Sequence, residues 1–144
     1  QEQKQMELDA VTLDRVICGE QQPESDHFME MLNSNTGSDE DLHWREARDN
    51  GWFSYLMKTQ ADTVAQIRIV YKGRPNRDAT VWVNDVKVGT LTSAVPNELS
   101  ISEFALPQAL QGEKQLRVKI GTATSKTTVR IYEVRLVKNA EPTK

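Results

Sequence analysis

The stretch that decides the fold spans residues 80–89 and reads TVWVNDVKVG. Apolar and polar residues alternate on both sides of a central Asn-Asp pair, as they do in half-buried β-strands. Asparagine and aspartate tolerate the positive φ angles that a two-residue hairpin turn requires. The stretch therefore predicts a β-hairpin with Trp82 on its exposed face. Pairing the two valines that flank the turn places all four valines on the opposite, buried face: Val81, Val83, Val86 and Val88.

The same alternation continues through the second half of the chain. We expect further strands over residues 11–17, 51–58, 64–71, 98–106, 115–120 and 127–137, with one helical turn over 107–110. The apolar phase of the last segment shifts between Ile131 and Val134, which predicts a β-bulge near Tyr132 and Glu133. Seven to eight strands at this spacing predict an all-β fold. The expected architecture is an antiparallel β-sandwich of jelly-roll type, similar to galactose-binding and other carbohydrate-binding modules.

Residues 19–50 interrupt this pattern with about thirty mostly polar residues of weak periodicity, about twenty of which are polar or charged. Loops of this length are uncommon inside compact domains and are often functional. We expect a long loop here, with a short helical turn over residues 25–32. The strand that follows carries apolar residues on both faces, so the loop is expected to cover its outer face and Trp52 to lie in the core.

The chain has 144 residues, which suits a single domain. Residues 11–138 are expected to form the sandwich, residues 1–10 a linker or an artificial boundary segment, and residues 139–144 a polar tail. The net charge of −3 argues against a nucleic-acid partner. No apolar run approaches the roughly 20 residues of a membrane span, and no signal peptide is evident at residue 1. Cys18 is the lone cysteine, so we expect a small buried apolar side chain and no internal disulfide.

Several short motifs in a fixed order resemble a known family. They are VICGE at 16–20, ESDH at 24–27, NTG at 35–37, HWREAR at 43–48, GWFSY at 51–55 and EFALP at 103–107. Together with the hairpin and the last strand, they resemble the C-terminal accessory domain of bacterial glycoside hydrolases of the β-L-arabinofuranosidase family. The hairpin turn departs from that family, since it reads Asn-Asp instead of Asp-Gly. This difference changes the turn type and leaves the fold intact.

The resemblance implies a secreted or periplasmic parent enzyme of a kind common in gut Bacteroidetes. It also implies that the β-sandwich packs beside an α-helical toroid that houses the active site. The family's chemistry resembles a cysteine nucleophile held by a zinc cluster of cysteines and a glutamate, and none of this maps onto a chain with one cysteine. The acidic run at 39–41 is interpreted as a solvated loop. We therefore expect no catalytic residues and no enzyme activity in this domain.

The acidic N-terminal region raises the question of a metal. Glu24, Asp26 and His27, with Asp39 or Asp41, could supply oxygen and nitrogen ligands for a structural calcium ion. Their spacing has no calcium-loop signature, and side chains of this kind also cap turns and bind loop backbone. We favour the capping role and expect no cofactor.

A carbohydrate site is the remaining candidate. Indole rings suit the C–H faces of sugars, and histidine, arginine and asparagine suit sugar hydroxyls. The candidate binding residues are His43, Trp44, Arg45, Asn50 and Trp82. In the alternative interpretation, Trp44 anchors the loop against the sheet while Arg45 pairs with a carboxylate.

The sequence thus predicts a non-catalytic carbohydrate-binding accessory domain of a secreted glycoside hydrolase. Its expected partners are the catalytic domain of the parent chain and a plant polysaccharide or oligosaccharide. The first alternative is a purely structural domain that buttresses the catalytic domain and never contacts sugar. The second alternative makes the fragment itself a hydrolase.

Overall fold

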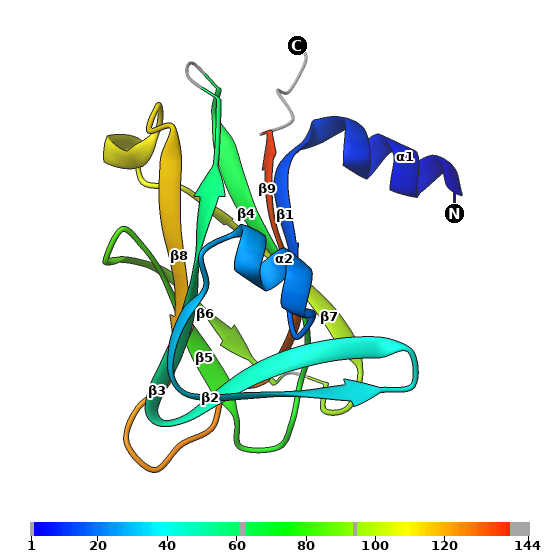
Figure 1. The fold of residues 1–144 in the computed structure, drawn as a ribbon, viewed down its shortest axis with the longest axis vertical. Coiled ribbons are helices and arrows are strands. Elements are labelled where there is room, and N and C mark those ends of the chain that lie inside the picture. The colour runs from blue at the N-terminus through cyan, green and yellow to red at the C-terminus, as the bar shows by residue number, and fades with distance from the viewer. Residues whose placement is uncertain (1, 61–62, 94, 139–144) are drawn as a thin grey trace.

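The computed structural model describes residues 2–60, 63–93 and 95–138. The expected polar tail at 139–144 lies outside this part of the chain. The described residues form two α-helices, one short 3-10 helix and nine β-strands. Their bounds are α1 Glu2–Val11, β1 Thr12–Ile17, α2 Gln21–Asp26, β2 Glu30–Asp39, β3 Leu42–Lys58, β4 Ala65–Lys72, β5 Asp78–Val83, β6 Val86–Thr92, β7 Leu99–Ala105, η1 Gln108–Leu110, β8 Gln115–Gly121 and β9 Arg130–Lys138 (Figure 1).

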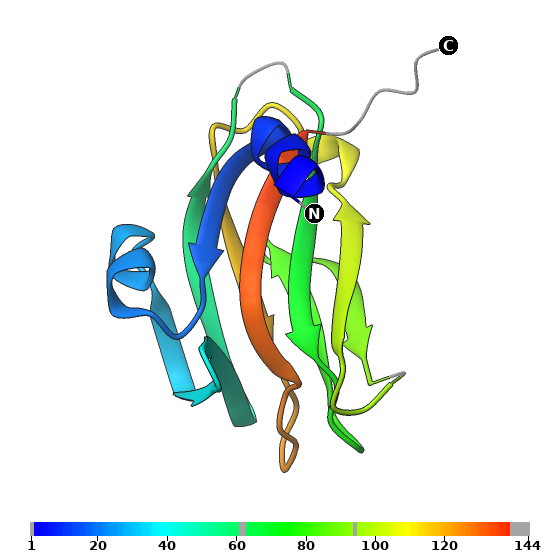
Figure 2. The ribbon, with the colours of Figure 1, turned by 90° about the vertical axis from the view of Figure 1, so that its right-hand side faces the viewer.

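The strands lie in two layers that face each other (Figure 2). One layer, the β3 sheet, has the order β6-β5-β8-β3, with β2 added beside β3. The other, the β9 sheet, has the order β9-β4-β7, with β1 added beside β9. The long strand β3 links the layers through a single bridge between Arg45 and Ile131. Because all pairings between these strands are antiparallel, the predicted antiparallel sandwich of jelly-roll type is confirmed.

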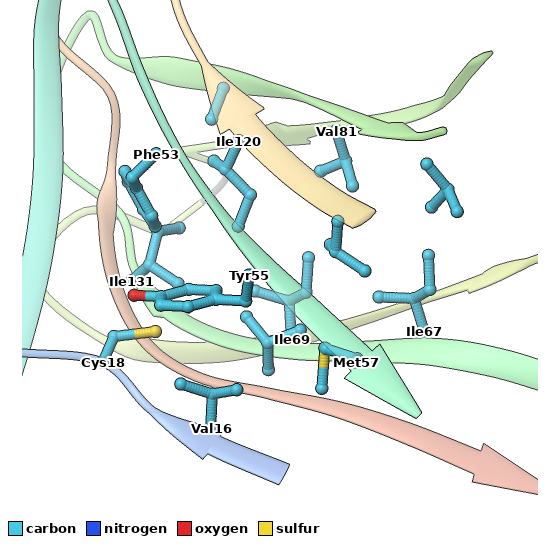
Figure 3. Packing of buried hydrophobic residues seen from close by; sticks show 14 of the residues in the cluster. Val16, Cys18, Phe53, Tyr55, Met57, Ile67, Ile69, Val81, Ile120 and Ile131 are labelled. Atoms are coloured by element: carbon cyan, nitrogen blue, oxygen red, sulfur yellow. The ribbon is translucent and has the colours of Figure 1, made fainter. Parts of the chain in front are cut away.

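The core lies between the two layers and is filled by alternate residues of the strands. Phe53, Tyr55 and Met57 of β3 are fully buried and meet Ile67 and Ile69 of β4 (Figure 3). The inward side of β8 consists of Leu116, Val118 and Ile120, as the sequence predicts.

The predicted bulge in the last strand is confirmed. On β4, Val70 pairs with Glu133 and the next residue, Tyr71, pairs with Ile131. Tyr132 is therefore the extra residue, and the shift explains why Ile131 and Val134 both face the core.

The β5–β6 hairpin has the predicted two-residue turn, with φ of 49° at Asn84 and 69° at Asp85. The prediction of four valines on one buried face is wrong. A register shift pairs Val81 with Gly89, so Val88 becomes the extra residue of a bulge, and Val86 is 43% exposed. The missing side chain at Gly89 leaves the space that Phe104 fills, because an added Cβ would lie 2.2 Å from the Phe104 ring.

The region predicted as a long loop is instead α2 followed by a hairpin of β2 and β3. Polar side chains dominate β2, which hides its alternation in the sequence. The helical turn lies earlier than predicted, and Met31 and Leu32 belong to β2. Within residues 1–10, expected as a linker, α1 begins at Glu2 and has no buried residue. Within the described chain, every helix is too short and too polar to cross a bilayer.

The hairpin supplies a matched stability test. Val83→Asp should lower the free energy of unfolding by several kcal/mol, because it buries a charge without a partner. Val86→Asp makes the same change at the exposed neighbour across the turn and should cost about 0.5 kcal/mol or less. Chemical denaturation of both variants would check this, and equal losses would contradict the observed register.

Candidate functional site

The side of the β3 sheet that faces away from the core carries the candidate site. Every second residue of its three central strands points to this side. Trp52 of β3 pairs with Gly121 of β8, which in turn pairs with Thr80 of β5. The next row consists of Ser54, Lys119 and Trp82, and the row after that of Leu56 and Arg117. We call this surface the outer face: Trp52, Ser54, Leu56, Thr80, Trp82, Arg117, Lys119 and Gly121.

Two half-buried tryptophans on the outer face share one lysine. The Nζ atom of Lys119 lies 5.5 Å from the centre of the Trp52 ring and 5.0 Å from that of Trp82. Both distances are within the range of a cation–π interaction. Gly121 leaves room for the rings, since a Cβ there would lie 2.9 Å from Trp52 Cβ and 3.3 Å from Trp82 Cζ3. The two indoles are thus held in place by contacts within the protein.

The outer face continues past Arg117 into a cleft of about 320 Å³. Arg117 Nη1 donates hydrogen bonds to the Phe28 carbonyl at 2.9 Å and to Ser54 Oγ at 3.4 Å. Phe28 forms one wall of the cleft and is 64% exposed. Its other lining residues are Asp14, Asp26, His27, Leu56, Lys58 and Gln115.

Of the residues predicted to bind carbohydrate, Trp82 lies on the outer face and Asn50 lies beside it. Asn50 is exposed two residues before Trp52, in a kink where its φ is 66° and its N–H donates to the Ala123 carbonyl. The expectation that Trp52 lies in the core is wrong. Because Phe53 and Tyr55 face the core, the alternation of β3 directs Trp52 outward.

Trp44 lies elsewhere and is only 8% exposed. Its ring covers Gly37 of β2, where an added Cβ would lie 2.2 Å from Trp44 Cζ2. The guanidinium carbon of Arg130, a residue of β9, lies 4.3 Å from the centre of the Trp44 ring. This position matches the anchoring role, because Trp44 fastens the β2–β3 hairpin to the rest of the sandwich.

Arg45 is 7% exposed and pairs with the buried Glu24 of α2 through two hydrogen bonds. Arg45 Nε donates to Oε2 at 2.7 Å, and Nη2 donates to Oε1 at 3.0 Å. The same carboxylate accepts from Tyr55 Oη at 2.6 Å and from the Gly19 N–H at 2.9 Å. Glu24 therefore joins α2 to β3 as a satisfied buried ion pair.

His43 faces a different cleft of about 250 Å³, which lies between the hairpin and the β9 sheet. Ile17, Val70 and Tyr132 line this cleft together with His43. The five predicted residues therefore do not meet in one place. Reading β3, β8 and β5 strictly by alternation would have pointed to Trp52, Lys119 and Arg117, which the sequence prediction omitted.

The carboxylates considered as metal ligands have other partners. Glu24 binds Arg45, Asp39 binds Lys72, and His27 Nε2 lies 2.7 Å from Asp14 Oδ1. No three His, Cys, Asp or Glu residues in the described part of the chain group closely enough to hold a metal ion. Cys18 is fully buried, as predicted, and burial raises the pKa of its thiol.

The fold defines a class, the jelly-roll sandwiches, and the solved structures that share it include carbohydrate-binding modules. Residues 7–137 match the family model described as "Family of unknown function (DUF6805)", and the chain belongs to that family. No match was found among curated proteins.

Solved structures share the fold at low sequence identity. The C-terminal CBM6 module of a laminarinase from Zobellia galactanivorans has a TM-score of 0.59 and 9% identity, with 86% of this chain and 98% of that chain covered. The module CBM6cm-2 of Cellvibrio mixtus lichenase 5A, in complex with cellotriose, gives 0.58 and 11%, with 89% and 98% covered. An exo-β-1,3-galactanase from Phanerochaete chrysosporium gives 0.59 and 12%, with 75% of this chain covered. The present chain spans only 27% of that enzyme.

The buried Glu24 predicts how stability depends on pH. Burial alone would raise the pKa of Glu24, but hydrogen bonds from Arg45, Gly19 and Tyr55 outweigh it and hold that pKa below its ordinary value of 4.5. Between those two pKa values the unfolded chain binds more protons than the native protein. The free energy of unfolding should therefore be at its plateau above about pH 4.5 and decrease as the pH falls through the lower, native pKa.

Thermal unfolding from pH 7 to pH 2.5 would measure this dependence. Glu24→Gln should lower stability at neutral pH and flatten the acid limb, with a residual slope from Glu133, whose pKa is also lowered. Asp26→Asn, an exposed change on the same helix, should reproduce the wild-type profile. An unchanged acid limb in Glu24→Gln would contradict the assignment.

Proposed function

We propose that this domain binds carbohydrate through its outer face and is a non-catalytic accessory module of a glycoside hydrolase. The observation that carries the proposal is the pair of outward tryptophans fixed on either side of Lys119. Aromatic faces with a few placed polar groups are typical of sites that bind small organic ligands. A sugar ring can lay its C–H face on an indole and direct its hydroxyls to the neighbouring donors and acceptors.

The outer face supplies both kinds of contact. Trp52 and Trp82 offer ring surface, while Lys119 and Arg117 offer N–H donors and Thr80 offers a hydroxyl. The pre-set positions of the indoles favour binding, because little side-chain entropy is lost when a ligand arrives. Modules of similar fold carry carbohydrate-binding names, and one was solved with cellotriose, which supports the proposal by analogy of fold.

The parent enzyme is part of the proposal. The motif resemblance points to a glycoside hydrolase of the β-L-arabinofuranosidase family, in a secreted or periplasmic setting. The catalytic domain of that parent and a plant polysaccharide or oligosaccharide are the proposed partners. Arabinose-containing oligosaccharides are therefore the first probes to use.

A structural role is the second candidate, and a separate observation favours it. The β9 sheet exposes Leu99 and Ile101 side by side with Val70 on its outward side, near Leu42 of the hairpin. An exposed apolar patch of this kind suits contact with another protein surface. The two roles use opposite sheets, so variants can separate them.

Binding should depend on the outer face. Trp52→Ala and Trp82→Ala should each weaken arabino-oligosaccharide binding by roughly tenfold, which corresponds to about 1.4 kcal/mol. Isothermal titration calorimetry would measure the loss. Ile101→Ala, an apolar change at a residue 55% exposed on the opposite sheet, is the matched control and should bind like wild type. Unchanged binding by both tryptophan variants would place any sugar site elsewhere.

The proposal also predicts no turnover. Glycoside hydrolysis requires an acid and a nucleophile or base held across the scissile bond. Incubation of the 144-residue chain with aryl arabinofuranosides and galactosides should release no aglycone. Release that disappears when one carboxylate is changed to its amide would overturn the non-catalytic assignment.

A further inference from the structure

We propose that the saccharide bound by the outer face is anionic, and that its carboxylate or sulfate groups contact Lys119 and Arg117. This inference rests on the proposed function and names the chemical class of its ligand. It starts from a difference in charge pairing between the two sheets of the sandwich.

On the β9 sheet, the outward arginines are neutralised by carboxylates. Arg15 lies 2.6 Å from Glu133, and Arg135 lies 2.9 Å from both Glu133 and Asp9. Arg68 lies 3.5 Å from the same Glu133. These three arginines are therefore neutralised by carboxylates within the protein.

The outer face differs in this respect. In the described part of the chain, the Arg117 side chain forms no ion pair and donates only to neutral oxygens of Phe28 and Ser54. The only carboxylate partner of Lys119 there is Asp85, at 4.0 Å, whose side chain is 91% exposed in the hairpin turn. Surface pairs of this kind contribute little. Arg117 and Lys119 thus lie two residues apart on β8 without a strong ion pair, although the chain as a whole has a net charge of −3.

The contacts of both cations leave donors free for a ligand. The indole rings of Trp52 and Trp82 attract the Lys119 ammonium but accept none of its three N–H bonds in the conventional way. Among the described residues, Arg117 uses only Nη1 of its guanidinium in side-chain hydrogen bonds, so Nε and Nη2 remain as a fork. Such a fork matches the two oxygens of a carboxylate or sulfate group.

The flanking charges are arranged around this centre. Lys87 of β6 is the strand-pairing partner of Trp82 of β5. Lys58 lines the adjoining cleft. The nearby acids lie at the borders: Glu30 is on β2, Asp85 is in the turn, and the adjoining cleft holds Asp26 and Asp14, which pairs with His27. An acidic sugar stacked on the tryptophans would place its charge over Lys119 and Arg117 of β8, where the exposed Asp85 is the one carboxylate of the described chain that forms an ion pair with either residue.

Calorimetric titration of the 144-residue chain at low ionic strength tests the inference with three probes. They are an oligogalacturonate, a sulfated galacto-oligosaccharide and a neutral arabino-oligosaccharide of similar length. At least one acidic probe should bind about tenfold more tightly than the neutral one, and this advantage should shrink as salt screens the charges. The stronger of the two acidic probes identifies the carboxylate or the sulfate as the natural group.

Variants assign the effect to the two cations. Lys119→Gln and Arg117→Gln should each remove most of the acidic preference, roughly tenfold, and leave weaker neutral binding measurable. Lys4→Gln on the exposed helix α1 makes the same change in net charge and should keep the preference. Matching melting curves for wild type and variants confirm that any loss is local.

The possible outcomes separate this inference from the proposed function. Equal affinity for acidic and neutral probes, lost in Trp52→Ala, would overturn the anionic ligand and support the carbohydrate site. Acidic binding that survives Trp52→Ala and Trp82→Ala would overturn both. A preference retained in both cation variants would overturn the roles of Lys119 and Arg117. Absence of binding to all three probes would overturn the function and the inference together.

Discussion

The candidate site depends on the two-residue period of a single strand. The core contains the fully buried side chains of Phe53, Tyr55 and Met57, so β3 must direct these three side chains inward. Trp52 then has no other direction than outward. The register with β8 places Gly121 beside Trp52 and Lys119 one row further, which leaves space for Trp82 of β5. A slip of one residue would exchange the core with the aromatic surface, which makes the register costly to change.

The other half of β3 is held by a different kind of interaction. Glu24 is buried and satisfies its carboxylate with Arg45, Tyr55 and the backbone of Gly19. A buried charge of this kind is tolerated only with all its partners present, so it fixes α2 and the hairpin in one arrangement. Trp44 adds a stacked contact to Arg130 on β9. These contacts hold the N-terminal segment against the sandwich and leave the central tryptophan surface uncovered by it.

The limits of the sequence prediction follow from the same residues. Strands with apolar inward positions, such as Leu116, Val118 and Ile120, could be predicted because burial imposes their period. β2 could not, since its polar side chains carry no such period and its strand form depends on pairing with β3. The position of Val88 could not be predicted, because a bulge has no signature in the hairpin sequence. For the site, aromatic content indicated both Trp44 and Trp82, and only the fold shows that Trp44 is the anchor.

The pairing of β1 with β9 has a mechanical consequence. β1 pairs with no other strand in the described chain, and its register begins with Thr12 beside Val137 and ends with Ile17 beside Glu133. Tension between the segments that flank the sandwich would load the Thr12–Val137 pair first, and the pairs would then open one after another. The β1–β9 pairing therefore separates at low force, because its hydrogen bonds break one at a time and not together. It lies on the sheet opposite the tryptophans, so a domain under traction could lose β1 while the surface of β3, β8 and β5 kept its shape.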